Sequence, residues 1–305
     1  MARRILVSGA SGLIGTALRS ALAARGDQVV RLVRRPPSGA DEIRWDPTAG
    51  HVDVGQVEPV DAVVNLSGAP VGRRWTPRYK RELLESRVHT TRTLVQHLDR
   101  LGERVPLINA SAVGVYGSDR GEEELTEASD PGHTFLADVV KAWELEACAA
   151  QDGGRRVALA RTGLVLTSDG GALGPLLPLA RLGLGGPIGS GRQWWPWISM
   201  EDEVRALLHL VDEDVHGPVN LVSPGSARQV EVARALGRAL HRPAVVPTPA
   251  AALRLALGEL ADDVLGSQLV RPAVLEQTGF VWRHARLEDA VRQVASPWHD
   301  LTVRP

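Results

Sequence analysis

The chain has 305 residues, of which 44% are hydrophobic and 23% charged, and its formal net charge is -1. This balance is typical of a globular protein and gives no overall electrostatic reason to expect nucleic acid or an anionic membrane as a partner, although it leaves local patches open. The single cysteine, Cys148, excludes an internal disulfide and a thiolate metal cluster. Because the first apolar run is too short for a signal peptide and no stretch is long enough to span a membrane, we expect a cytoplasmic protein.

A glycine-rich turn follows the first apolar stretch. Residues 5–7 are typical of a buried parallel strand, and apolar residues recur at helical spacing from Leu13 onward. Between them lie Gly9, Gly12 and Gly15. A Cβ at such a turn would hold a pyrophosphate away from the backbone, and the start of a helix offers free N–H groups to an anion. The spacing predicts a dinucleotide-binding turn, although a tight structural turn uses the same residue type.

The second predicted strand, residues 28–33, ends in two arginines. A chain that binds NAD usually places Asp or Glu there to hold the ribose hydroxyls. Here Arg34 and Arg35 follow, and a guanidinium offers a fork of donors and a fixed charge to a 2′-phosphate. The position therefore favours NADP(H) over NAD(H). The alternative is that the arginines and the two prolines after them form only a solvated loop.

Strands and helices alternate through the first half of the chain. The hydrophobic pattern predicts further strands at 62–66, 106–110 and 157–166, and helices at 77–101 and 135–150. Such alternation predicts an α/β fold, a Rossmann-type doubly wound parallel sheet covered by helices on both faces. Ligands of these sheets gather at the carboxyl ends of the strands. Segments expected to converge there are 8–12, Arg34, 65–68, Ser111 and 161–165.

The second half of the chain differs from the first in composition and in its pattern of predicted elements. Residues 170–191 are rich in glycine and proline and predict a loop and strand passage, and residues 230–240 and 250–260 predict helices. Trp194, Trp195 and Trp197 form either a core wedge or a wall of the substrate site. We therefore expect an NADP-binding Rossmann domain over 1–166, to which segments near 196–222 return, and a smaller C-terminal α+β substrate lobe over 167–305.

Several motifs together resemble the extended short-chain dehydrogenase/reductase superfamily. They are residues 9–15 (GASGLIG), 65–68 (NLSG), 115–117 (VYG), 197–202 (WISMED) and 217–220 (GPVN). Residues 73–77, 86–87, 109–117, 135–137, 143–144, 161–163 and 181–191 are similar to an "epimerase family" subgroup of NADP-dependent oxidoreductases. The resemblance extends from Ile5 to about Ala290.

The resemblance implies a set of contacts to NADP(H). The turn residues would hold the pyrophosphate, and Arg34 with Arg35 the 2′-phosphate. The turn residues are Gly9, Ser11, Gly12, Leu13, Ile14 and Gly15, and the residues implied along the rest of the cofactor are Leu66, Ser67, Gly68, Glu82, Arg87 and Val165. Glu82 and Arg87 are also spaced to interact with each other as exposed ions of one helix.

The usual catalytic pair of the superfamily is absent from the sequence. A tyrosine normally precedes a lysine by four residues, but the residue four before Lys141 is Ala137. If Glu144 marks the register instead, the two positions are Leu136 and Val140, and neither tyrosine of the chain has the required lysine. Ser111 and Tyr116 are the nearest candidates for a catalytic hydroxyl. Their structural alternatives are a serine at a strand end and a packed aromatic ring.

The expected substrate is not a nucleotide sugar. Trp195 stands where many extended members carry the arginine that holds a diphosphate, and Ser199 where they carry a histidine. We read no metal site, because His89 and His97 are eight residues apart with no third ligand nearby.

Three functions remain open at this point. The first is an NADP(H)-dependent oxidoreductase acting on an unknown small molecule. The second is a catalytically silent NADP(H)-binding regulator, for example one linked to cell division, and the third an epimerase or isomerase with tightly bound cofactor. By analogy, a homodimer would form through the long helix that ends near Leu101 and the helix that contains Trp143.

Overall fold

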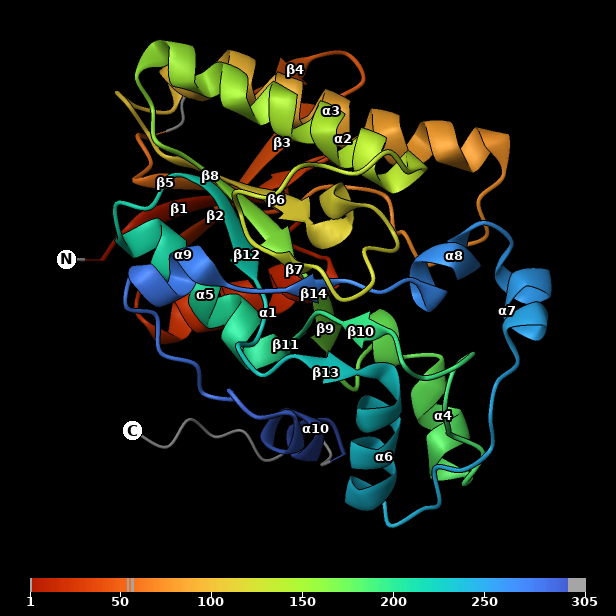
Figure 1. Cartoon of the computed structure of the whole chain (residues 1–305). Coiled ribbons are helices and arrows are strands. Elements are labelled where there is room, and N and C mark those ends of the chain that lie inside the picture. Colours follow the sequence, from red (N-terminus) through yellow and green to blue (C-terminus); the bar gives the residue numbers. More distant parts are fainter. Residues whose placement is uncertain (1, 54, 56–57, 296–305) are drawn as a thin grey trace.

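The computed structural model describes residues 2–53, 55 and 58–295. Its centre is an eight-stranded sheet in the order β12-β8-β6-β5-β1-β2-β3-β4 (Figure 1). All neighbouring strands of this sheet are parallel except β3 and β4, which pair antiparallel. The strands are β1 (Arg4–Ser8), β2 (Gln28–Val33), β3 (Glu42–Asp46), β4 (His51–Val52), β5 (Ala62–Asn65), β6 (Leu107–Ala112), β8 (Val157–Thr162) and β12 (Gly217–Leu221).

Helices cover both faces of the sheet. In Figure 1, α2 (Pro77–His97) and α3 (Phe135–Cys148) lie above it, and α1 (Leu13–Ala24), α5 (Met200–Asp212) and α9 (Ala273–Gln277) lie below it. The predicted doubly wound α/β fold is confirmed. Within the described ranges, no helix is long and apolar enough to cross a bilayer.

Local sequence explains where these elements begin. Ile5, Leu6 and Val7 are fully buried in β1. Thr76 caps α2 by accepting a hydrogen bond from the Tyr79 N–H, and Pro77 occupies the first helical position. The predicted helix over 77–101 ends as an α-helix at His97 and continues as a 3-10 turn, η1 (Leu98–Arg100). The second predicted helix, α3, ends at Cys148 rather than at residue 150 and is followed by η3 (Ala149–Gly153).

The strand predicted over 157–166 is divided at Gly163. β8 stays in the central sheet, whereas β9 (Leu164–Leu166) pairs with β11 (Trp197–Ser199). The N–H of Gly163 donates to the Leu221 carbonyl, and a Cβ on Gly163 would collide with the Pro196 carbonyl. This close approach redirects the chain, and the apolar run in the sequence could not reveal it.

A smaller lobe packs below the carboxyl edge of the sheet. It contains β10 (Trp194–Trp195), β13 (Ala227–Arg228), α4 (Leu176–Arg181), α6 (Gln229–Ala239), α7 (Ala250–Leu257), α8 (Leu260–Leu265) and α10 (Leu287–Ala295). Short elements elsewhere are β7 (Glu124–Leu125) paired with β14 (Leu269–Val270), η2 (Val113–Tyr116) and η4 (Gly171–Leu173).

The passage over 170–191 contains a helix, α4, that we did not predict. Trp195 and Trp197 are buried, as the core interpretation required. The helix predicted over 250–260 ends at Leu257 and gives way to α8. As expected for the segments near 196–222, β12 returns to the central sheet. Residues 1 and 296–305, the ends of the two expected domains, lie outside the described residues.

Candidate functional site

The three glycines of the first turn are not equivalent. Gly9 has a φ of +66°, and a Cβ there would lie 2.6 Å from the Leu66 carbonyl oxygen. A Cβ on Gly15 would collide with the Gly9 carbonyl. Gly12 differs, because its only close neighbour would be the Gly9 oxygen at 3.2 Å. Packing therefore accounts for Gly9 and Gly15, whereas Gly12 leaves open space at the start of α1.

That open space adjoins unsatisfied backbone donors. Gly12 is the N-cap residue of α1, and no side chain caps the helix. The first N–H groups of a helix lack intrahelical acceptors, and the helix dipole adds positive potential there. Ser11 and Leu13 beside it are exposed and Ile14 is half-buried. The turn thus has the chemistry and the clearance that a pyrophosphate requires.

The loop after β5 lies against this turn and over a buried cation. A Cβ on Gly68 would come within 3.2 Å of the Arg87 guanidinium. Arg87 is only 9% exposed, and its guanidinium donates to the Leu83 and Ala69 carbonyls at 3.0 and 3.1 Å. Burial lowers the pKa of Arg87 to about 10. Among the described residues no carboxylate pairs with it, so the cation beneath Gly68 is without a counter-charge.

The structure separates the two arginines after β2. Arg35 donates to both carboxylate oxygens of Glu42, at 2.6 and 2.7 Å, and these hydrogen bonds hold the pKa of Glu42 at about 2. Arg34 is exposed, and in the described segments its side chain forms no hydrogen bond or ion pair. Arg34 is therefore the freer of the two to meet a phosphate.

The remaining residues implied for the cofactor, Val165 and Glu82, lie on different elements of the fold. Val165 is buried in β9, and in the loop after it a Cβ on Gly171 would lie 3.6 Å from the Leu13 side chain. Glu82 is exposed on α2, and it forms no ion pair with Arg87. The alternative that these two residues pair as surface ions is therefore wrong.

The two candidate catalytic hydroxyls lie in a buried network that sequence reasoning missed. The Ser111 hydroxyl donates to Glu144 Oε1 at 2.5 Å, and Arg161 donates to both carboxylate oxygens at 2.8 and 2.9 Å. The Tyr116 hydroxyl accepts from Arg161 at 3.0 Å and donates to Asn220 at 2.7 Å. Burial raises the pKa of Tyr116. These contacts support the structural alternative for both residues, because each hydroxyl is buried and already has its partners.

A second acid is buried on the opposite face of β8. Glu203 of α5 is 1% exposed, and its Oε1 accepts a hydrogen bond from the Thr162 hydroxyl at 2.8 Å. Its Oε2 is buried with no partner among the described residues. Burial raises the pKa of Glu203 to about 8, so the carboxyl holds its proton at neutral pH. The sequence carried a signal for this residue, since Glu203 falls on the apolar stripe of α5 between Met200 and Leu207.

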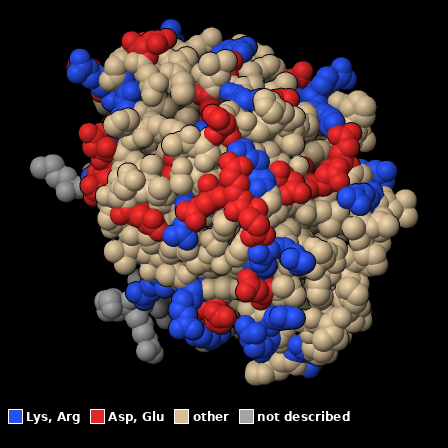
Figure 2. Space-filling view, in the orientation of Figure 1, with Lys and Arg blue, Asp and Glu red and all other residues tan. Residues whose placement is uncertain are grey.

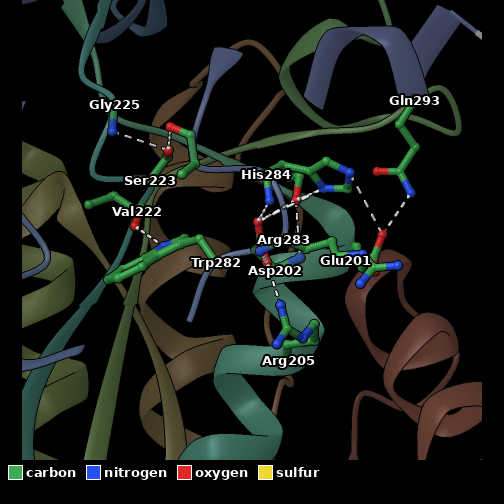
Figure 3. A network of polar contacts seen from close by, with 12 residues as sticks. Glu201, Asp202, Arg205, Val222, Ser223, Gly225, Trp282, Arg283, His284 and Gln293 are labelled. Carbon is green, nitrogen blue, oxygen red and sulfur yellow. Dashed lines mark hydrogen bonds and ion pairs between the residues drawn. The ribbon is translucent and has the colours of Figure 1, made fainter. Parts of the chain in front are cut away.

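A third polar cluster fastens the C-terminal segment to α5 (Figure 3). The fully buried Asp202 carboxylate accepts from the N–H groups of Arg283 and His284 at 2.7 and 2.8 Å. Ser199 caps α5 by accepting from the Asp202 N–H, and its Oγ lies 3.1 Å from His284 Nδ1. The position of Ser199 thus has a structural explanation. No group of three or more metal-ligating side chains, containing His89, His97 or others, occurs in the described part of the chain.

Comparisons with known proteins agree with this architecture. A model of the NAD dependent epimerase/dehydratase family matches residues 5–222, and one of a domain of unknown function, DUF1731, matches residues 248–294. "Epimerase family protein ML0860" of Mycobacterium leprae (strain TN) is 42% identical over 290 residues, covering 94% of each chain.

Two solved structures are similar along nearly the whole of this chain. Human epimerase family protein SDR39U1 (isoform 2), solved with NADPH, is 36% identical with a TM-score of 0.86 and covers 96% of this chain and 99% of that one. A nucleoside-diphosphate sugar epimerase from Corynebacterium glutamicum is 32% identical with a TM-score of 0.79 and covers 97% of this chain and 58% of that one.

Proposed function

Because the chain belongs to the NAD-dependent epimerase/dehydratase family, we propose that it is an NADP(H)-dependent oxidoreductase acting on a small, largely uncharged molecule. The observation that carries the proposal is the room beside Gly12, where an added Cβ would meet only the Gly9 carbonyl oxygen, at a tight 3.2 Å, and where a pyrophosphate needs to approach the backbone. The NADPH in the similar human structure supports the choice of cofactor.

Different residues around the turn would bind different parts of the cofactor. The N–H groups of Ser11, Leu13 and Ile14 would meet the pyrophosphate. Arg34 would meet the 2′-phosphate, with Arg35 beside it held in place by Glu42. The bound cofactor supplies or accepts a hydride at its nicotinamide ring.

The loop over Arg87 adds a favourable charge to the same edge. A buried cation without a counter-ion is costly, and an anionic ligand near Gly68 would relieve that cost. Leu66 and Ser67 adjoin Gly9, and Val165 lies close in sequence to the loop that contacts Leu13, so these residues would line the remaining length of the cofactor. Glu82 is placed there only by the family resemblance.

Thr162 and Glu203 offer a route for the proton. The Thr162 hydroxyl is half-buried at the carboxyl end of β8, and the protonated Glu203 stands behind it at 2.8 Å. In carbonyl reduction the hydride adds to the carbonyl carbon. Thr162 would then give its proton to the carbonyl oxygen and receive the proton of Glu203, once the two hydroxyl groups turn so that the Glu203 carboxyl donates and Thr162 accepts; Glu203 would be left as a carboxylate and would regain its proton from solvent. Ser111 and Tyr116 are too enclosed to take this role.

Calorimetric titration with NADPH and NADH tests the cofactor assignment. We expect Arg34→Ala to weaken NADPH binding by about 1.5 to 3 kcal/mol, the size of a charge-assisted contact, and to leave NADH binding nearly unchanged. Arg44→Ala is the matched control, because Arg44 is an exposed arginine on the adjacent part of β3. Equal losses for NADPH and NADH would contradict the assignment.

A catalytically silent NADP(H)-binding regulator is the second candidate. The observation that favours it is that the usual tyrosine is missing in either register: Ala137, fully buried, stands four residues before Lys141, and Leu136 stands there if Glu144 marks the register. Incubation with NADPH and a panel of carbonyl compounds separates the two candidates. Tight NADPH binding without turnover at any pH would favour the regulator. An epimerase would instead retain its cofactor through purification and consume none.

A further inference from the structure

Two segments of the lobe contain no acidic residue. The chain carries 36 Asp and Glu residues in 305, yet none lies in residues 170–200 or 232–258. The same segments contain Arg181, Arg192, Arg234, Arg238, Arg242 and Arg254, together with His241. The near-zero net charge of the whole chain therefore conceals a strongly one-sided distribution.

These two segments are neighbours in space. The Thr248 N–H donates to the Pro187 carbonyl at 2.8 Å, and the Gly189 N–H donates to the Thr248 carbonyl at 2.9 Å. Arg242 Nε donates to the Arg181 carbonyl at 2.9 Å. In Figure 1 the parts of these segments over 176–191 and 232–258 lie at the corner of the molecule that contains α4, α6 and α7. These parts of the acid-free segments thus lie side by side.

Exposed apolar side chains gather on this surface. Of the nine large hydrophobic side chains that are exposed among the described residues, five lie in the adjoining stretches 179–184 and 245–246. They are Leu179, Leu182, Leu184, Val245 and Val246, and Leu182 and Val245 are 73% and 74% exposed. Figure 2 shows the corresponding region at the lower right as largely uncharged, with basic side chains along its lower border. Exposed apolar groups clustered in this way mark an interaction site.

Cations border the apolar side chains. Arg234, Arg238, His241, Arg242 and Val245 line an open depression of about 510 Å³. Within the described residues, Glu288 is the one carboxylate that pairs with any of these three arginines, at 3.3 Å from Arg238. The arginine side chains are not needed to cap the C-terminal end of α6, because its last carbonyls already accept hydrogen bonds from the backbone N–H groups of His241 and Arg242. The depression is therefore suited to anions.

We propose that this basic–apolar face, formed by Leu179, Leu182, Leu184, Val245 and Val246 with Arg181, Arg234, Arg238 and Arg242, docks on a bilayer with anionic headgroups. A bilayer of this kind offers phosphates to the arginines and an apolar interior to side chains on projecting loops. Leu182 and Val245 are already 73% and 74% exposed, so these apolar side chains can enter a bilayer without rearrangement of the chain. The proposal does not depend on the cofactor assignment, since no residue of the glycine turn belongs to the face.

Vesicle flotation tests the docking. We expect the full chain to float with vesicles of phosphatidylcholine containing roughly one third phosphatidylglycerol, and not with phosphatidylcholine alone. Binding falls as salt rises, because the headgroup attraction is screened. Binding to both kinds of vesicle alike, or to neither at low salt, would overturn the proposal.

Two variants probe the two components of the face. Arg234→Gln with Arg238→Gln is expected to weaken binding about 25-fold, at about fivefold for each arginine near an anionic surface. Leu182→Ser with Val245→Ser is expected to abolish insertion while leaving weak, salt-sensitive binding. The matched controls are Arg78→Gln with Arg81→Gln on α2, and Leu145→Ser on α3, where Leu145 is 72% exposed.

NADPH titration of every variant separates this proposal from the proposed function. The face variants are expected to bind NADPH as the parent chain does. Loss of vesicle binding in the control variants would refute the assignment to this face. Sedimentation that shows a dimer disrupted by Leu182→Ser would equally overturn it, since the face would then join two copies.

Discussion

Removal of the Glu144 carboxylate should destabilise the protein more than removal of other carboxylates. Both of its oxygens accept hydrogen bonds from Arg161, Oε1 also accepts from Ser111, and the Glu144 and Arg161 side chains are only 11% and 9% exposed. Burial would lower the pKa of Arg161, but its contacts with Glu144 outweigh this and raise it. Glu144→Ala would leave the Arg161 cation buried and unpaired, at a cost of about 3 to 5 kcal/mol.

Urea unfolding of a short series measures this cost. Glu144→Gln keeps an acceptor oxygen but no charge and should lose about 2 kcal/mol. Replacing Glu144 and Arg161 together by leucine should cost much less than Glu144→Ala, because no buried charge remains. The control is Glu146→Ala, which breaks an exposed pair with Arg92 and should lose less than about 1 kcal/mol. If Glu144→Ala costs no more than Glu146→Ala, the reasoning about the buried pair is refuted.

Three further predictions follow from the site. Gly12→Ala should fold with a loss of less than about 1 kcal/mol yet bind NADPH at least tenfold more weakly by calorimetry, whereas Gly15→Ala should unfold at clearly lower urea. The folded state keeps the Glu203 proton up to about pH 8 while the unfolded chain releases it near pH 4.5, so the free energy of unfolding should fall as pH rises. The decrease should be about 3 kcal/mol between pH 5 and 7, and Glu203→Gln should reduce that slope; equal slopes would contradict the burial of the acid. NADPH at about 100 times its Kd should add about 2.7 kcal/mol to the free energy of unfolding, a gain that Arg34→Ala should reduce to between about 0.3 and 1.3 kcal/mol at the same concentration.

The elements that local pattern controls were predictable from the sequence. The buried run of β1, the turn after it, and the capped helices α2 and α3 follow from hydrophobic period, glycine placement and Thr caps. The different roles of Gly9, Gly12 and Gly15 were not predictable, because they depend on what a Cβ would meet across the fold.

Long-range polar contacts could not be predicted from the sequence either, because they also depend on which residues meet across the fold. Glu144 and Arg161 lie on α3 and β8, and no periodicity links a helix position to a strand position 17 residues away. Glu203 was accessible in principle, since an acid on an apolar stripe predicts a buried carboxyl. The division of the chain into two domains, the cytoplasmic location and a homodimer through α2 and α3 stay predictions.

The contacts around Asp202 bear on how the chain can be cut. Its carboxylate accepts two backbone hydrogen bonds when residues 283 and 284 return to the start of α5, and β14 and α9 likewise pack against β7 and β12. A fragment that stops after β12 would lose both backbone donors to Asp202, keep only its contacts with Ser199 and Arg205, and leave the edge strand without the packing of α9. The border between the two matched regions, 5–222 and 248–294, is therefore not a boundary between independently folding units. Two fragments expressed separately should unfold cooperatively only after they are mixed.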